Sequence, residues 1–322
     1  MNTKQQLLNL LMNQKQYISG SEIAEKLNIT RSAVWKNIQQ LQEQGYEIEA
    51  VRNRGYRFGG ENDVPNPELI RYYLGEYKDL FEIEVRDEVS STNSVLKEKA
   101  HDLKNWHTLL ALTQTSGRGR RGRSFFSPQG SGLYLSILVR LNVAAEVATH
   151  ITTAAAVAAC KAIEECTAAK PGIKWVNDIY VNGKKVCGIL TEASLSVESG
   201  GLDWAVMGIG FNIYEPEEGF GPELEQIAGA VSAKKEKDLK SRIAASFMKN
   251  FYDLCTNLEN RTLTEEYRKR SFMKGKTIEV LRGNEKLPAV AEDIDEECRL
   301  IVRYPDGRKE ALSSGEVSIK VK

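Results

Sequence analysis

The sequence is poor in the residues that build metal centres, disulfide frameworks and catalytic triads. Only three histidines occur, His101, His107 and His150, and their spacing matches no zinc-ligand pattern. The five cysteines are an odd number without paired close spacing, which favours reduced thiols over disulfides. No Ser-His or Cys-His arrangement stands out as a nucleophile with its base. We therefore expect no protein-bound metal and no covalent catalysis.

An excess of one charge and long apolar runs are also missing. Lys and Arg number 44, as do Asp and Glu, so the formal net charge is zero. This balance excludes a globally basic nucleic-acid coat protein and an acidic disordered tail. No stretch is long and apolar enough to cross a bilayer, and the N-terminus lacks a signal-peptide core. The sequence therefore predicts a cytoplasmic protein with no membrane partner, in which anion binding depends on local charge.

The length of 322 residues suggests two or three domains, and the composition changes twice along the chain. A helical start is followed by mixed strands and helices, and then by short β runs with turns at Gly283-Asn284 and Asp306-Gly307. The breaker-rich stretch 59–67 is typical of a linker. We predict an α+β multi-domain fold with domains at 1–60, 67–271 and 275–322, the last a small β-barrel.

The N-terminal domain has the pattern of a winged helix-turn-helix. Ser19 and Glu22 form a capping box for a helix over 22–27, and Thr30 begins a second helix over 31–44. Alternating residues over 46–58 then predict a β-hairpin. Residues 1–60 contain eight Lys or Arg and five Glu, a local net charge of +3 that suits DNA phosphates. The predicted DNA-binding residues lie on the second helix and the hairpin turn: Arg31, Ser32, Trp35, Lys36, Arg52 and Arg54.

Two plainer interpretations of this domain stay open. It can be a helical interaction module with a solvated charged face. Trp35 can be a partly buried anchor rather than a residue that contacts DNA bases.

The central domain shows alternating strand and helix patterns. Apolar strands are predicted over 81–85, 109–113, 133–139 and 204–212, and helices over 146–166 and 237–258. The segment 173–191 predicts two strands joined at Asn182-Gly183, a strong hairpin signal.

A loop at 117–123, Gly-Arg-Gly-Arg-Arg-Gly-Arg, combines flexible glycines with four arginines. It matches the dinucleotide fingerprint G-x-G-x-x-G, but residues 124–130 do not begin the helix that this fingerprint requires. A Walker loop is excluded as well, because Arg270 stands where the leading glycine of Gly275-Lys276-Thr277 belongs. The loop therefore suits a polyphosphate bound by guanidinium groups. A solvated basic loop or an RNA contact is the alternative for this loop taken alone.

Further polar motifs surround this loop in the sequence. Ser91-Thr92-Asn93 opens a helix after a strand, and Gln114 ends the next strand. Three segments follow the loop: Lys-Trp-Val-Asn-Asp at 174–178, Asn-Gly-Lys-Lys-Val-Cys-Gly-Ile-Leu at 182–190 and Gly-Ile-Gly-Phe-Asn at 208–212. In this order they resemble the biotin–protein ligases over essentially the whole chain. With the winged helix, the match is to the bifunctional bacterial ligase/repressor form.

The resemblance implies a class II synthetase-like central domain, an SH3-like C-terminal barrel and a two-step reaction. Biotin and ATP would form biotinyl-5′-AMP, with Mg²⁺ on the nucleotide, and the biotinyl group would then pass to a lysine. The implied biotin-binding residues are Ser91, Thr92, Asn93, Gln114, Arg118, Gly119, Arg120, Lys185 and Gly188. The implied ATP or adenylate residues are Arg120, Arg121, Arg123, Asn177, Gly208, Gly210 and Asn212. Lys185, Arg118 and Asp178 would be catalytic.

The implied partners are a biotin carboxyl carrier protein or carboxylase domain, and operator DNA bound by a ligand-dependent homodimer.

Two positions depart from the family pattern: Val176 replaces a proline, and Phe125 stands where tryptophan is common. Two alternatives stay open. One is a transcription factor that only senses biotin or its adenylate, and the other is a lipoate ligase.

Overall fold

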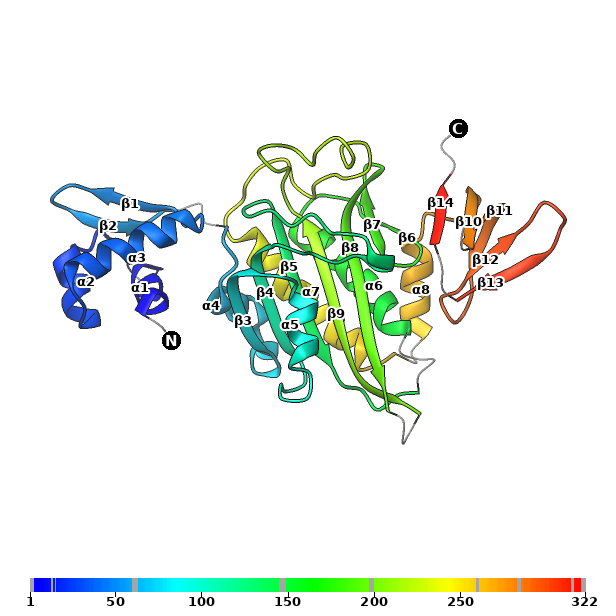
Figure 1. Cartoon of the computed structure of the whole chain (residues 1–322), viewed down its shortest axis with the longest axis horizontal. Helices are drawn as coiled ribbons and strands as arrows, with labels where there is room; N and C mark the ends of the chain where they lie inside the picture. The colour runs from blue at the N-terminus through cyan, green and yellow to red at the C-terminus, as the bar shows by residue number, and fades with distance from the viewer. Residues whose placement is uncertain are drawn as a thin grey trace.

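The computed structural model describes residues 3–12, 14, 16–59, 63–144, 149–196, 200–258, 261–282, 285–313 and 316–319. Within these ranges the chain forms a helical N-terminal body, a central sheet with helices and a C-terminal β body, which follow one another along the longest axis (Figure 1). The predicted α+β multi-domain fold is confirmed. The turn predicted at Gly283-Asn284 lies outside the described residues.

The N-terminal body is a three-helix unit followed by a hairpin. The helices are α1 (Thr3–Met12), α2 (Gly20–Leu27) and α3 (Arg31–Glu43), and the strands are β1 (Ile48–Val51) and β2 (Gly55–Phe58). Helix α2 begins at Gly20 rather than at the predicted Glu22, because Ser19 is the N-cap and its hydroxyl accepts the Glu22 N–H at 3.1 Å. Thr30 caps α3 in the same way. An apolar cluster closes the unit: Leu7, Leu11, Ile23, Val34, Ile38 and Leu41.

A short helix that the sequence analysis did not predict, α4 (Pro67–Leu74), leads into the central domain and continues into the 3₁₀ turn η1 (Gly75–Leu80). Its start has a clear local cause. The Asn66 side chain accepts the Glu68 N–H at 2.8 Å, and Pro67 occupies the first turn, where its missing N–H costs nothing.

The central sheet has seven strands in the order β3-β4-β5-β9-β8-β7-β6, of which β3 and β4 are parallel and the rest antiparallel. Their bounds are β3 (Glu82–Val89), β4 (His107–Gln114), β5 (Gly132–Val139), β6 (Gly172–Lys174), β7 (Asp178–Val181), β8 (Lys184–Leu195) and β9 (Leu202–Asn212). The segment 173–191 therefore holds parts of three strands, not two, because the three-residue β6 is too short to show a period. The predicted hairpin joins β7 to β8, with Asn182 and Gly183 both at positive φ.

Helices cover the two faces of this sheet unequally (Figure 1). Helices α6 (Thr149–Cys166) and α7 (Leu239–Cys255) pack together over one face and bury the large core, with α8 (Arg261–Arg270) beside α6. On the other face the described part of the chain places a single helix, α5 (Thr92–Glu98), under which Leu96, Leu109 and Val206 form a small cluster. Most of that face is therefore left for loops and for a cavity.

The C-terminal body is a five-stranded antiparallel sheet in the order β13-β12-β11-β10-β14. Its strands are β10 (Thr277–Arg282), β11 (Glu285–Ile294), β12 (Leu300–Arg303), β13 (Lys309–Leu312) and β14 (Glu316–Ile319). The predicted small C-terminal β domain is confirmed. The Trp175 indole N–H donates to the carbonyl of Cys298 at 3.0 Å, which ties this sheet to the central domain beside the cavity described next.

Candidate functional site

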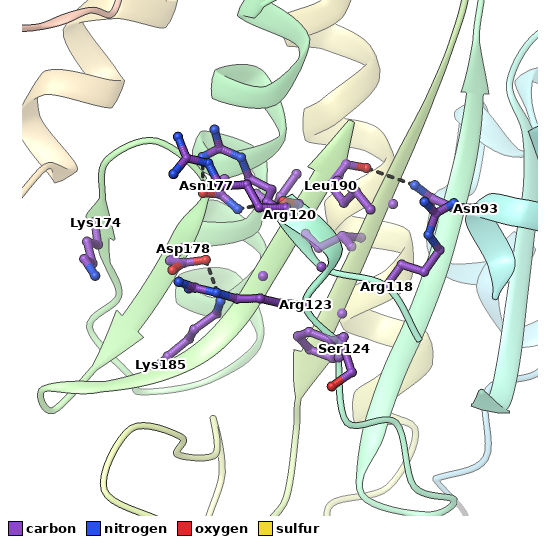
Figure 2. Close-up of a pocket in the computed structure, with 18 of the residues that line it drawn as sticks. Asn93, Arg118, Arg120, Arg123, Ser124, Lys174, Asn177, Asp178, Lys185 and Leu190 are labelled. Carbon is purple, nitrogen blue, oxygen red and sulfur yellow. Dashed lines mark hydrogen bonds and ion pairs between the residues drawn. The ribbon is translucent and has the colours of Figure 1, made fainter. Parts of the chain in front are cut away.

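A cavity of about 420 Å³ lies on the sheet face that carries α5, between the arginine–glycine loop, β8, β9 and the C-terminal sheet (Figure 2). It gathers predicted site residues that are far apart in the chain: Ser91, Thr92, Asn93, Gln114, Arg118, Gly119, Arg120, Arg121, Arg123, Asn177, Asp178, Lys185, Gly188, Gly208 and Gly210. Leu281, Lys286 and Val317 of the C-terminal sheet also line it, which the sequence did not indicate.

Strand register explains why these motifs meet. Asp178 on β7 pairs with Gly188 on β8, which pairs with Gly210 on β9. Two residues further along β8, Leu190 pairs with Gly208 on β9. Because side chains two positions apart share a face, these residues form adjacent rows on the cavity side of the sheet.

One end of the cavity is a hydrogen-bonded polar cluster. The Gln114 side-chain oxygen accepts the Thr92 N–H at 2.9 Å and the Thr92 hydroxyl at 3.2 Å. The Ser136 hydroxyl, fully buried on β5, donates to Oδ1 of Asn93 at 2.6 Å and lies 2.7 Å from the Thr92 hydroxyl. Ser136 was missed because it sits within the apolar strand 132–139. These bonds fix the polar side chains before a ligand arrives.

The glycines on β8 and β9 make room for protein side chains. A Cβ on Gly208 would lie 1.9 Å from Oδ1 of Asn93, and one on Gly210 would lie 2.4 Å from the Phe125 ring. A Cβ on Gly188 would lie 3.2 Å from the same ring. The resemblance attributes these glycines to close approach of the ligand. In the structure their immediate neighbours are Asn93 and Phe125, so the glycines shape the cavity through these two side chains.

The other end of the cavity is strongly cationic. The described lining contains seven cations and one carboxylate, Asp178: the cations are Arg118, Arg120, Arg121, Arg123, Lys174, Lys185 and Lys286. The arginine loop lies across the sheet, with Arg121 at a φ of 55° within the short 3₁₀ turn η2 (Arg120–Gly122). The Arg120 guanidinium donates to the Asn177 side chain at 3.0 Å. Such a density of cations favours a multiply charged anion.

Lys185 and Asp178 form a close ion pair in the cavity, with Nζ 2.6 Å from Oδ1 (Figure 2). Both side chains are partly buried, and the backbone of Lys185 is held on its free edge by Ile227 and Gly229 through bonds of 2.8 and 2.9 Å. Lys185 is therefore a cation on a rigid strand, fixed at the cavity floor.

Among the residues predicted to bind biotin or ATP, Asn212 alone does not line the cavity. Its amide donates to the backbone carbonyls of Gly229 at 3.1 Å and Lys185 at 3.5 Å. It therefore holds the segment after β9 against β8.

The departure from the family pattern at Val176 lies beside the cavity residue Trp175. The Trp175–Val176 peptide is cis, and the Val176 carbonyl accepts the Tyr267 hydroxyl at 3.0 Å.

Comparison with protein families divides the chain as its structure does. Residues 3–57 match a helix-turn-helix (HTH) domain, residues 85–212 the biotin/lipoate A/B protein ligase family, and residues 275–320 the biotin protein ligase C-terminal domain. The bifunctional ligase/repressor BirA of Bacillus subtilis is 33% identical over 307 residues, which cover 93% of each chain. This chain belongs to the BirA family of bifunctional ligase/repressors. The resemblance inferred from the motif order is confirmed.

Other relatives agree with the BirA family assignment. The BirA of Escherichia coli is 33% identical over 207 residues, covering 64% of this chain and 62% of its own. Among solved structures, the biotin protein ligase of Aquifex aeolicus in complex with biotin and ATP superposes with a TM-score of 0.60 at 24% identity. It covers 75% of this chain and 99% of its own. This second likeness supports the fold of the central and C-terminal domains.

The HTH domain of this BirA-family chain presents its predicted DNA-binding residues to solvent. Arg31, Ser32 and Lys36 are exposed on α3, and the Trp35 side chain is 58% exposed. Arg52 and Arg54 are exposed on the hairpin turn, and the Arg54 guanidinium lies 4.9 Å from the centre of the Tyr17 ring. The predicted DNA-binding cations are thus exposed on α3 and at the turn of the β1–β2 hairpin, which is the wing.

None of the helices in the described ranges has both the length and the apolar character needed to cross a membrane. No three His, Cys, Asp or Glu side chains of the described residues come together as a group that could hold a metal ion.

Proposed function

We propose that this chain attaches biotin to a lysine of a carrier domain in two ATP-dependent steps. In the first, a biotin carboxylate oxygen attacks the α-phosphorus of ATP, and pyrophosphate leaves. In the second, the carrier amine attacks the acyl carbon of biotinyl-5′-AMP, and AMP leaves with the electrons of the broken bond. The observation behind the proposal is one cavity with a preorganised polar end, at Thr92 and Gln114, and a cationic end, at Lys185 and the arginine loop.

The division of the cavity into a polar and a cationic end supports the following proposed roles. Ser91, Thr92, Asn93 and Gln114 would bind the uncharged ureido ring and its chain, with Gly188 beside them. The carboxylate end would lie toward Arg118, Gly119, Arg120 and Lys185. The phosphates and nucleoside of MgATP would contact Arg120, Arg121, Arg123 and Asn177. Gly208 and Gly210 would act indirectly, through the Asn93 and Phe125 side chains that pack against them. Asn212 contributes indirectly by holding the backbone of Lys185.

Electrostatics explains why cations and not a nucleophile are needed. A carboxylate at about 4 Å from a phosphate charge is repelled by roughly 4 kcal/mol at an effective dielectric constant near 20. We propose that Lys185 and Arg118 offset this repulsion, because preorganised charges lose little to reorganisation during the reaction. In the second step Asp178, next to Lys185, is placed to accept a proton from the incoming ammonium group.

We propose that the same chain represses transcription as a ligand-dependent homodimer. Two winged helices related by a two-fold axis would match a palindromic operator, with α3 in the major groove. The exposure of Arg31, Trp35, Lys36 and Arg52 supports this role. We propose a cytoplasmic location, where ATP, the carrier protein and operator DNA would all be available to the chain. We propose that three domains, 1–60, 67–271 and 275–322, carry out these functions between them.

Mass spectrometry of a carrier domain incubated with the full chain, biotin and MgATP tests the enzyme. We expect the mass of one biotinyl group on one lysine. Lipoate in place of biotin separates the two ligase activities, and no modification with biotin would refute the proposal. Biotin-dependent exchange of labelled pyrophosphate into ATP distinguishes an enzyme from a protein that only senses the ligand.

A further inference from the structure

Glu192 lies on β8 just beyond the cavity and was not recognised as a site residue from the sequence. It is two positions past Leu190 and four past Gly188, so all three positions belong to the same face of the strand. Its own side chain is 18% exposed. It is not one of the residues that line the cavity, but two of the residues it contacts are.

Two side chains donate hydrogen bonds to this one carboxylate, and a third forms an ion pair with it. Oε2 accepts the Asn93 amide at 3.0 Å. Oε1 is 2.7 Å from the Lys97 ammonium and 3.4 Å from the Arg118 guanidinium. Burial alone would raise the pKa of Glu192, but the hydrogen bonds from Lys97 and Asn93 and the charges of Lys97 and Arg118 outweigh it and lower that pKa. Glu192 is therefore a stable anion.

The contact with Asn93 completes a fixed set of bonds. The Asn93 amide nitrogen also donates to the Leu190 carbonyl at 3.2 Å, and its oxygen accepts from Ser136. Since Oδ1 of Asn93 packs directly against Gly208, its orientation shapes the polar end of the cavity. Arg118 approaches the same carboxylate from the arginine loop, and Figure 2 shows it beside Asn93. One anion thus connects the loop to the sheet and to α5.

We infer that Glu192 is a positioning residue that holds Asn93 and the loop residue Arg118 over the cavity before the ligand binds. This inference rests on the proposed function for the identity of that ligand. In the free protein the ion pair restrains the loop near its binding position, so less conformational freedom is lost when biotin and ATP arrive. Once adenylate is bound, its own anionic groups hold the arginines, and Glu192 matters less.

The variant Glu192→Gln keeps the shape and an oxygen that can accept from Asn93 but removes the charge. We expect the KM for biotin to rise about two- to fivefold, the range for loss of a half-exposed ion pair, with kcat changed less than about twofold. Hydrogen exchange of residues 117–124 should be faster by a similar factor in the free variant and equal to wild type in the adenylate-bound variant. A merely structural role would not confine the difference to the free state.

Lys97→Met is the matched control, because Lys97 shares the carboxylate but does not line the cavity. It should leave the KM for biotin and the loop exchange within about twofold of wild type. Raising NaCl should speed loop exchange more in wild type than in Glu192→Gln, since salt screens the Arg118–Glu192 ion pair that the variant lacks.

Equal loop exchange in the free wild-type and Glu192→Gln proteins would overturn the inference, as would equal effects of Glu192→Gln and Lys97→Met. The proposed function fails separately, through absence of biotin-dependent pyrophosphate exchange in the wild-type protein. The exchange measurement on the free protein would still test the positioning role in that case.

Discussion

The Tyr214 hydroxyl donates a buried hydrogen bond of 2.5 Å to Oδ2 of Asp63. Asp63 belongs to the segment between the N-terminal helices and the central domain, and Tyr214 follows the last residues of β9. The other carboxylate oxygen accepts the Lys240 N–H at the start of α7, at 2.7 Å. The segment before α4 is therefore hydrogen-bonded to two parts of the central domain that follow the cavity-lining strand β9 in the chain: the residues directly after β9 and the start of α7.

Removing this hydroxyl by Tyr214→Phe should destabilise the protein by about 1–3 kcal/mol, because a buried carboxylate loses a donor. Burial already raises the pKa of Asp63, so its charge depends on the bonds that remain. Urea unfolding measures the change. Tyr72→Phe, at a position 77% exposed, is the control and should change stability by less than about 0.5 kcal/mol. Equal losses in both variants would show that the bond contributes nothing.

Lys240 gives a pH-dependent prediction. Its ammonium is buried, donates to the Gly130 carbonyl and lies 5.4 Å from the centre of the Tyr214 ring. Burial lowers its pKa from 10.5 to about 8. Between these values the unfolded chain binds more protons than the folded one, so this residue makes stability rise with pH from about 8 to 10.5, by on the order of 3 kcal/mol.

Comparing wild type with Lys240→Met by urea unfolding isolates this effect. The free energy of unfolding of wild type should increase relative to that of the variant as the pH rises through this window. Below about pH 7 the difference between the two free energies should be constant. A difference that does not change between pH 8 and 10.5 would show that Lys240 titrates normally.

Lys185→Ala should slow biotin-dependent pyrophosphate exchange by about 10²- to 10³-fold, the cost of removing one preorganised charge at the reacting groups. Lys184→Ala is the matched control, because its ammonium points away to the Glu225 carbonyl at 3.1 Å and does not line the cavity. Both variants should unfold at the wild-type temperature. Wild-type exchange in Lys185→Ala would remove this residue from the mechanism.

Arg52→Ala should weaken binding to a mixed-sequence DNA duplex and lower the slope of log K against log salt by about 0.9, the loss of one phosphate contact. Lys26→Ala is the control on α2, where the ammonium pairs with Glu22 at 3.1 Å. Carrier biotinylation should stay at the wild-type level in both variants. An unchanged salt slope in Arg52→Ala would exclude the wing from phosphate contact.

Local patterns in the sequence determined most of the elements and the members of the site. Caps such as Ser19 and Thr30, the Asn182-Gly183 turn and the glycine-rich arginine loop act over a few residues, so their signals are visible in the chain itself. Strand β6 and helices α4 and α8 were missed because they are short or largely polar, and their stability comes from tertiary packing.

Only the tertiary structure decided how the site residues act on one another. Ser136 and Glu192 meet Asn93 across separations of 43 and 99 residues, and Asp63 meets Tyr214 across 151. Such contacts depend on strand order and register, which no short pattern encodes. The amino-acid sequence therefore specified the chemistry, whereas the neighbours of each glycine and carboxylate followed from the order in which seven strands pair.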